Sequence, residues 1–597
     1  MPTVLCNNCN DIIGDSSSGP ATDILHLRSK LILSHAEITL TRQLVEKDEE
    51  TLKRYDAEIK RLQGLVEKLK EERRVIDGRL REHRGILSPL RRLPVEILDK
   101  IFALVCLGKN NRRPRHEGYS LRISSPSKWA PNGIRAAAYN LSHTCSSWRR
   151  IVTSRPHLWS SIHLDICGVE CDVRPLLEIY LKNSEGRPLK IKVVEKGKDE
   201  RHGYWLTNDF VYFLGGHGLN AFRMLFAYMS RCSELELDVH WEVLSDEGSF
   251  DWSHVCFPVL RTFRNSIDMG TTNAMIHGPT AWFWRALRDA PNLREVHTDR
   301  VLPYHLDVIP YRQLTSLQIN AVGGIHRLLR LLEDSPCLHS LKVWYLEPTD
   351  SDIDTPLHIE LPRLRTLSID TTDECPLDRF SALFASLIMP NLECLRIENS
   401  YDPVDNQYHL PSDFISMLQH SSQTLRKLTL DLEHTCLKDS VLVNTLHILP
   451  SLTQFEVTLD SGHGEPLTRP SPCIAHLLGK LTISAGSSSA STILAPRLSR
   501  LFLHENSSRL NAKIVEMLLK MAESRSKYGL ARLGRGEELV PICKVQLTYA
   551  FAWLDSSDEE KQHEPPRGFD PFCDPSVTEK IKTLKEAGTK CIIKESD

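Results

Sequence analysis

Two copies of one short pattern stand near the middle of the chain: Leu314-Thr315-Ser316-Leu317-Gln318-Ile319 and Leu338-His339-Ser340-Leu341-Lys342-Val343. Each copy has apolar residues at its first, fourth and sixth positions. Successive residues of a β-strand point to opposite faces, so the fourth and sixth side chains share one face. Each copy therefore predicts a short strand with one buried face.

The same pattern recurs along most of the chain. Its first positions are Leu293, Leu314, Leu338, Leu364, Leu392, Leu425, Leu452, Leu478 and Leu498, with less regular copies from Cys232 and Leu260. Successive regular copies lie 20 to 33 residues apart. A unit of this length cannot bury its apolar face alone, so neighbouring units stack. The sequence predicts an irregular leucine-rich-repeat solenoid over residues 166–550, a curved parallel sheet with short helices.

Segments around these strands predict the helices and the end of the array. Residues 325–332 and 380–387 have the apolar spacing of short helices. We expect a further helix over residues 511–526 and a strand over residues 542–549. Residues 551–597 are expected to form an acidic loop followed by a C-terminal cap, which consists of a helix over 577–587 and the strand Cys591-Ile592-Ile593.

An apolar heptad runs through residues 23–87. Its first seam consists of Ile24, Leu31, Ile38, Val45, Leu52, Ile59, Val66, Arg73, Leu80 and Leu87, and a second seam is apolar from Tyr55 to Ile76. Such a repeat predicts one long helix, and a 3.5-residue apolar period favours winding around a partner helix. Two alternatives stay open: a homodimer through a coiled coil, or a helix packed on the protein's own body.

A different unit follows over residues 88–165. The dipeptide Ser88-Pro89 ends the heptad helix, and Pro94 suits the first turn of a new one. Residues 108–133 are polar and basic and are expected to form a flexible loop. A third helix is expected from Ile134 to Val152, followed by a strand that begins with the alternating Ile162, Leu164 and Ile166.

This unit resembles an F-box. The resemblance rests on Leu93-Pro94-Val95-Glu96-Ile97-Leu98 with Ile101-Phe102, and on Cys145-Ser146-Ser147-Trp148 with Leu158-Trp159. The whole chain resembles the F-box/leucine-rich-repeat proteins of basidiomycete fungi. The expected architecture is therefore α/β: a heptad helix, a small helical F-box with a basic insert at 108–133, the solenoid and the cap.

The resemblance implies a function and a binding surface. F-box proteins dock on a Skp-type adaptor of a cullin–RING ubiquitin ligase and hold a protein target for modification. The family's adaptor-binding residues correspond here to Leu93, Pro94, Ile97, Leu98, Ile101, Phe102, Leu158 and Trp159. Several of these, Ile101 and Phe102 in particular, have core packing as an alternative role. The second candidate function is a ligase-independent scaffold that uses the coil and the solenoid.

A candidate surface for the target follows from the repeat pattern. The seventh position of each unit lies on the face opposite the buried one, which is the concave wall in leucine-rich arrays. Three consecutive units carry Asp370, Glu398 and Asp431 there, and Trp344 precedes them. A column of like charges favours a cationic partner, so we expect the target to offer a Lys/Arg-rich segment. Solvated acids that bind nothing are the alternative.

Composition and charge argue against nucleic-acid binding and membrane association. The 597 residues include 74 Lys and Arg against 77 Asp and Glu, a formal net charge of -3. Without a cationic surplus we expect no nucleic-acid binding. No apolar run is long enough for a membrane span, and the first residues lack the pattern of a secretory signal. We therefore expect an intracellular protein, cytoplasmic or nuclear or both, that does not bind membranes.

No recognisable chemistry is encoded. Cys6 and Cys9, in an expected disordered tail over residues 1–22, form a lone C-x-x-C pair. Tetrahedral zinc takes four ligands, so this pair is incomplete and we expect no metal site. Phosphate-binding and nucleophile motifs are missing from the sequence. We therefore expect no catalytic residues, no cofactor and no enzymatic activity.

Overall fold

A computed structural model describes most of the chain as two compact units, Met1–Leu98 and Asp99–Asp597. The described residues are 3–6, 11–13, 34–87, 89–108, 118–126, 132–195, 216–239, 241–244, 252–266, 281–301, 309–320, 325–346, 358–371, 380–398, 411–432, 440–460, 472–483, 493–506, 512–532, 539–549 and 574–595.

The first unit contains a short strand pair and one long helix. Strands β1 (Thr3–Cys6) and β2 (Asp11–Ile13) pair antiparallel, in contrast to the expected disordered tail. Helix α2 (His35–Ile86) is 52 residues long. The heptad predicted it from residue 23, but residues 23–33 lie outside the described part of the chain, as does Cys9. No residue of α2 is buried.

Helix α2 begins at a capping box. The Ser34 backbone N–H donates to Glu37 Oε2 over 2.8 Å, and the Glu37 N–H donates to Ser34 Oγ over 3.4 Å. These bonds satisfy backbone donors that have no partner inside the helix. At the other end, the 3-10 turn η1 (Pro89–Arg92) separates α2 from helix α3 (Val95–Leu107).

Part of the expected loop over 108–133 is a strand. Strand β3 (Leu121–Ile123) pairs antiparallel with β4 (Ile134–Ala136) and parallel with β5 (Ser161–Asp165). The prediction of a loop is wrong here because Leu121 and Ile123, alternating with Arg122, are fully buried. A three-residue alternation is too short to stand out among polar and basic neighbours.

The single helix expected from Ile134 to Val152 is also wrong. Three elements replace it: β4, helix α4 (Ala137–Ser142) and helix α5 (Ser146–Thr153). The break falls at Cys145, whose extended backbone serves as the N-cap of α5. The apolar spacing runs through this break and therefore hides it from a periodicity argument.

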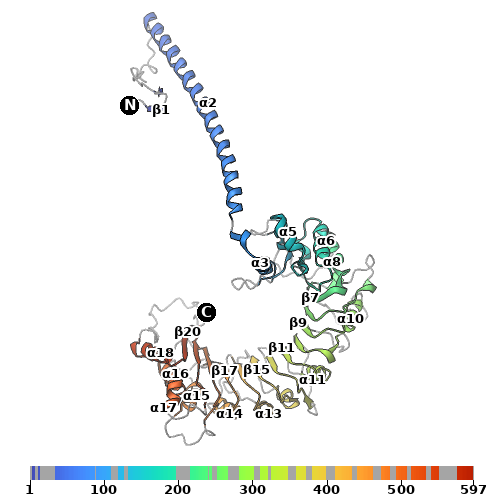
Figure 1. Ribbon diagram of the computed structural model, residues 1–597. Coiled ribbons are helices and arrows are strands. Elements are labelled where there is room, and N and C mark those ends of the chain that lie inside the picture. Colours follow the sequence, from blue (N-terminus) through green and yellow to red (C-terminus); the bar gives the residue numbers. More distant parts are fainter. Residues whose placement is uncertain are drawn as a thin grey trace. The chain divides into compact units, whose positions relative to one another are not determined.

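The second unit is built on an open sheet of sixteen described strands (Figure 1). Each pair of neighbours is parallel apart from β3 and β4. The order begins with β4, β3 and β5 and then follows the chain. The further strands are β6 (Leu189–Val194), β7 (Cys232–Asp238), β8 (Thr262–Asn265), β9 (Glu295–Val301), β10 (Ser316–Asn320), β11 (Ser340–Leu346), β13 (Thr366–Thr371), β15 (Cys394–Glu398), β16 (Lys427–Leu432), β17 (Gln454–Asp460), β18 (Arg500–Asn506), β19 (Lys544–Tyr549) and β20 (Lys590–Glu595).

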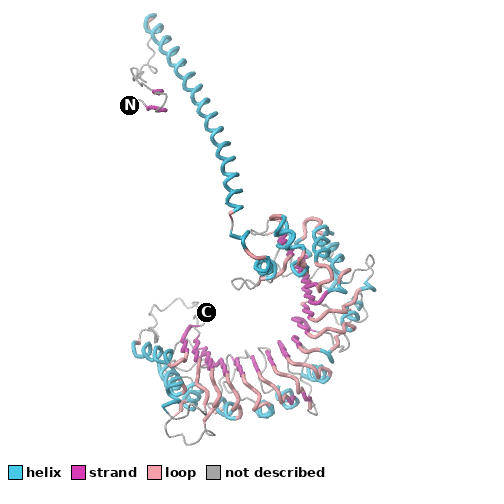
Figure 2. The backbone as a smooth tube through the Cα atoms, in the orientation of Figure 1, coloured by secondary structure: helices cyan, strands magenta, loops and turns pink. Residues whose placement is uncertain are grey.

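Helices cover one face of this sheet. In Figure 2 the strands of the second unit follow the inner side of an arc and the helices follow its outer side. The two-stranded pair β12 (Ile359–Glu360) and β14 (Leu387–Ile388) lies apart from the large sheet. The helices are α6 (Arg174–Asn183), α8 (Gly216–Phe226), α10 (Ala281–Arg288), α11 (Ile325–Glu333), α12 (Ser381–Ser386), α13 (Ser412–His420), α14 (Val441–His447), α15 (Pro472–Leu481), α16 (Ala512–Ser524), α17 (Lys527–Arg532) and α18 (Pro575–Glu586).

The core lies between the strands and the helices. In β10, Leu317 and Ile319 are buried while Gln318 between them is half-exposed. Equivalent leucines and isoleucines of neighbouring strands stand in register, as Leu317 does with Leu341 and Leu341 with Leu367. Continuous apolar columns therefore run through the array, which is the stacking that single units need. The expected α/β architecture with a long helix and a mostly parallel sheet is confirmed.

One predicted repeat unit is wrong. The pattern at Leu478, Leu481 and Ile483 predicts a strand, but helix α15 occupies most of it and β17 pairs directly with β18. The same stretch also has helical spacing, because Ile474, Leu477, Leu478 and Leu481 lie on one face, and all four are fully buried. Where a segment fits both the two-residue period of a strand and the 3.6-residue period of a helix, burial of the larger apolar face decides the conformation.

Candidate functional site

Helix α3 and the turn before it contain most of the residues assigned to the adaptor. Every fourth residue of the helix is buried, from Leu98 through Phe102 to Cys106. Leu93 and Ile101 are half-buried, Pro94 is exposed, and Ile97 is 41% exposed. Leu93, Pro94, Ile97 and Ile101 therefore remain accessible, whereas Leu98 is a packing residue.

Phe102 is also a packing residue. Its ring lies 4.8 Å from the ring of Trp148 in an edge-to-face arrangement, and Phe102 is only 1% exposed. Trp148 is placed by the N-cap of its helix, where its backbone N–H donates to Cys145 Sγ over 3.5 Å. The C-x-x-W motif thus has a structural reason: the cysteine caps α5, and the tryptophan packs against α3. Such an aromatic pair contributes about 0.5–1.5 kcal/mol beyond its burial.

Leu158 and Trp159 are buried as well. Trp159 Nε1 donates to the Val152 carbonyl over 2.9 Å, and its ring meets the Tyr180 ring edge-on at 4.9 Å. The Tyr180 hydroxyl donates to the Ser120 carbonyl over 3.1 Å, and burial raises the pKa of Tyr180 well above its usual range. Leu158 and Trp159 therefore join the start of the sheet to the helices, and neither is exposed to a partner.

The structure adds two residues to the accessible part of α3. Leu104 is 70% exposed and Val105 is 57% exposed. With Ile97 and Ile101 they follow the helical spacing of three and four residues, so they extend one apolar stripe. The sequence pattern contained this signal, since Ile97 and Leu104 are separated by two turns, but the adaptor assignment drawn from the resemblance leaves both new residues out. An ion pair between Asp99 and Arg155 at 3.1 Å ties α3 to the segment after α5.

The inner face of the sheet contains the acids assigned to the target. In the strand register, Asp370 of β13 lies opposite Glu398 of β15, and Glu398 lies opposite Asp431 of β16. Neighbouring parallel strands lie about 4.8 Å apart, so the three acids form a column as the pattern predicts. The column continues to Thr458 of β17 and His504 of β18. Ser484 lies outside the described residues.

A neighbouring arginine reduces the charge repulsion between the acids of this column. Arg396, two residues before Glu398 on the same strand, forms an ion pair with Glu398 and lies 3.9 Å from Asp431. One cation therefore offsets part of the negative charge. Arg396 occupies the fifth position of its unit, which shares a face with the seventh, so alternation alone identifies it as part of this surface.

Trp344 is not aligned with the acids in the way the repeat spacing suggests. The register between β11 and β13 shifts after Val343, so Trp344 and Tyr345 together oppose Asp370. Such a bulge bends the strand locally. The Lys342 ammonium lies 4.5 Å from the centre of the Trp344 ring, a cation–π contact on the same face.

Further along the inner face, Glu456 contacts His504. Glu456 Oε1 lies 3.6 Å from His504 Nε2. This hydrogen bond to His504 outweighs the effect of burial and lowers the pKa of Glu456 below its ordinary value. The inner face therefore carries an acid beside a histidine here, as it carries acids beside Arg396 further along the column.

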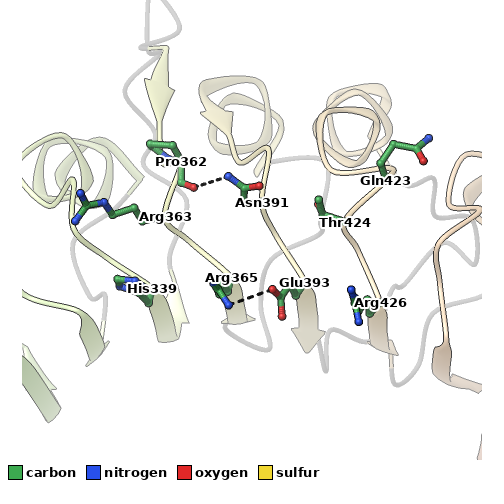
Figure 3. A pocket seen from close by; sticks show the side chains of 9 residues that line it. All are labelled: His339, Pro362, Arg363, Arg365, Asn391, Glu393, Gln423, Thr424 and Arg426. Atoms are coloured by element: carbon green, nitrogen blue, oxygen red, sulfur yellow. Dashed lines mark hydrogen bonds and ion pairs between the residues drawn. The ribbon is translucent and has the colours of Figure 1, made fainter.

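A second feature is a basic pocket where several strands begin (Figure 3). Its volume is about 420 Å³, and it is lined by His339, Pro362, Arg363, Arg365, Asn391, Glu393, Gln423, Thr424 and Arg426. Arg365 pairs with Glu393 at 3.4 Å, and Asn391 Nδ2 donates to the Pro362 carbonyl over 2.8 Å. The pocket is open and mostly polar, and each of its three arginines is exposed. It was not anticipated from sequence, because the residue before each strand follows no apolar pattern.

Other kinds of site are not found among the described residues. In the described ranges, no group of three or more His, Cys, Asp or Glu side chains is arranged to hold a metal ion. No described helix combines the length and the apolar character of a membrane span.

The acidic inner face and the accessible stripe of α3 are thus two candidate surfaces for protein partners. Comparison of the chain with protein-family models and with curated proteins finds no match.

Proposed function

We propose that this protein is an F-box substrate receptor. Its α3 region would dock on a Skp-type adaptor of a cullin–RING ubiquitin ligase, and the inner face of its repeat sheet would hold a protein target. The receptor itself performs no chemistry. It raises the effective concentration of target lysines beside the ubiquitin-charged enzyme.

One observation carries the proposal. The motif residues divide into a packed set, in which Phe102 meets Trp148, and an accessible set that includes Pro94 and Ile97. The packed set gives α3 a fixed position against α5. With Leu104 and Val105 the accessible set forms one contiguous apolar stripe, and contiguous exposed apolar surface marks interaction sites. This is the division that a docking helix requires.

The acidic inner face supports a cationic target. Asp370, Glu398 and Asp431 stand in register and form an acidic column. A segment rich in Lys and Arg would add favourable contacts with this column and would be drawn to this face by long-range attraction.

Adaptor binding tests the proposal. In the full chain, the double variant Leu93→Ala/Pro94→Ala should weaken binding to a Skp-type adaptor at least about thirtyfold, because anchors at the centre of an interface contribute about 2 kcal/mol or more. The control variants Ile179→Ala and Val259→Ala remove exposed apolar side chains elsewhere. The dissociation constants are compared by calorimetry.

Two outcomes would count against the receptor assignment. The first is adaptor binding that the double variant leaves unchanged. The second is wild-type protein that does not bind the adaptor at all, which would favour the ligase-independent scaffold.

Target capture tests the inner face separately. The triple variant Asp370→Asn/Glu398→Gln/Asp431→Asn removes the charges and keeps the side-chain shapes. We expect it to lose the Lys/Arg-rich proteins that the wild type captures, at unchanged adaptor affinity. An identical captured set from a folded triple variant would place the target elsewhere on the protein.

A further inference from the structure

Helix α2 leaves a long apolar seam uncovered. The helix spans 52 residues, about 78 Å at 1.5 Å per residue. Its seam residues Leu52, Ile59 and Leu69 are each more than half exposed. Its three glycines, Gly64, Gly78 and Gly85, all occupy the heptad position opposite the seam, so the seam itself has no gap in its side chains. An apolar strip of this length indicates a partner helix.

Two charged residues interrupt the seam over its central part. Asp48 and Arg73 occupy seam positions, both are exposed, and neither has an ion-pair partner within the described part of the chain. In a parallel, in-register pair of helices, each would face its own copy. Two aspartates and two arginines would then meet as like charges inside an apolar interface, which is unfavourable.

An antiparallel pair places these charges together. Asp48 and Arg73 lie at equal distances from opposite ends of α2: Asp48 from its first residue and Arg73 from its last. When two antiparallel copies overlap along their whole length, Asp48 of one copy therefore faces Arg73 of the other, twice by symmetry. The oppositely charged pairs then replace the two like-charge contacts.

The apolar residues satisfy the same alignment. Leu52 and Leu69 are likewise equally distant from the two ends of the helix, so they face each other. Three further apolar pairs are also equally distant from the two ends and would face each other: Ile59 with Leu62, Tyr55 with Val66, and Val45 with Ile76. Full overlap thus gives consecutive apolar layers from Leu52 to Leu69, bounded on each side by an Asp48–Arg73 layer.

The charge along α2 favours the same orientation. Residues 35–60 contain seven acidic and five basic residues, a net charge of -2. Residues 61–86 contain eight basic and five acidic residues, a net charge of +3. Antiparallel copies set the acidic half against the basic half, whereas parallel copies set like against like.

We propose that α2 pairs with α2 of a second copy of this chain as an antiparallel coiled coil overlapping along its full length, with Asp48 of each copy facing Arg73 of the other. This dimer does not depend on adaptor binding, so the two proposals can fail separately.

A charge-swap series in the full-length protein tests the pairing. Asp48→Arg and Arg73→Asp should each raise the dimer dissociation constant at least about tenfold, because each places like charges in two layers. The double variant Asp48→Arg/Arg73→Asp restores opposite charges and should return the constant to within about threefold of the wild type. Glu46→Arg makes the same change of charge as Asp48→Arg outside the seam and serves as the control. Dissociation constants come from sedimentation equilibrium, and circular dichroism verifies helicity.

Disulfide cross-linking gives the orientation independently. Protein carrying Leu52→Cys, mixed with protein carrying Leu69→Cys, should form the 52–69 disulfide, identified by mass spectrometry of the linked peptides. In the antiparallel pair two copies of position 52 lie about 25 Å apart, too far for a disulfide. A 52–52 disulfide, a double swap that fails to restore binding, or a wild type that is monomeric at micromolar concentration would each overturn the proposal.

Discussion

Arg525 is a buried charged residue whose side chain is accommodated by hydrogen bonds to backbone carbonyls. The side chain is 2% exposed. Its guanidinium donates to the carbonyls of Leu481 over 2.7 Å and Ala495 over 3.0 Å, and also to that of Leu494. Burial lowers the pKa of Arg525 to about 10, so the group remains charged at neutral pH. The contacts satisfy the last carbonyl of α15, which has no partner within its helix.

We therefore expect Arg525→Met to be among the most destabilising single substitutions. It leaves three carbonyls without their donor, at a cost of about 3–5 kcal/mol. Arg525→Lys should recover only part of this, because an ammonium group cannot match the planar fork. Chemical denaturation measures the loss, and Lys520→Met, an exposed position on α16, is the control. A loss below about 1 kcal/mol in Arg525→Met would contradict the role assigned to the guanidinium.

Glu456 makes a pH-dependent contribution to the stability of the fold. Its folded-state pKa is lowered from 4.5 by the hydrogen bond with His504, so the ionised carboxylate stabilises the fold above pH 4.5. The contribution is lost as the pH falls through the lowered value. Glu456→Gln should cost less than about 1 kcal/mol at pH 7, since the group is partly exposed. The difference from the wild type, followed by thermal unfolding, should vanish in acid. A difference that grows in acid would reverse this assignment.

At the element scale, α2 is a helix without internal burial. The prolines in Leu62→Pro/Leu69→Pro remove backbone donors and break two turns near its centre. We expect the double variant to lose helical circular dichroism and self-association, with the unfolding transition of the repeat sheet unchanged. The control Lys60→Ala/Glu67→Ala changes two residues outside the seam and should keep both the helix and self-association. A double-proline variant that still self-associates would show that α2 is not the contact.

Elements also show what the sequence could and could not predict. The strands around Leu317, Leu341 and Leu367 were predictable, because alternation and repetition coincide there. Strand β3 was not, since two buried residues give too short a signal. The segment of helix α15 was predicted as a strand, because its leucines fit the repeat pattern of a strand as well as the spacing of a helix. At the candidate site, the acidic column followed from counting positions, whereas the burial of Phe102, Leu158 and Trp159 depends on packing between distant segments.

At the scale of the whole molecule, the sheet is open and its two edges differ. Among the described strands, the last one, β20, pairs with β19 alone, and α18 contacts it. Within the described part of the sheet, β20 shields the edge of β19, and exposed edges invite association. Terminal units of repeat arrays commonly have this capping role.

Removal of residues 574–597 should therefore expose β19 and cause aggregation. We expect light scattering to rise and the unfolding temperature to fall relative to the full chain. As a control, Lys582→Glu/Lys585→Glu changes the charge of α18 and keeps β20. A truncated protein as soluble and as stable as the full chain would show that β20 is not a cap.

We propose that the segment from η1 to α3 is the docking surface for a Skp-type adaptor. Hydrogen–deuterium exchange of the full chain, measured with and without the adaptor, tests this proposal. We predict slower exchange on adaptor binding for amides of residues 89–107, with the inner strands β13, β15 and β16 unchanged. Unchanged exchange over residues 89–107 at saturating adaptor, or protection confined to the inner strands, would contradict the claim.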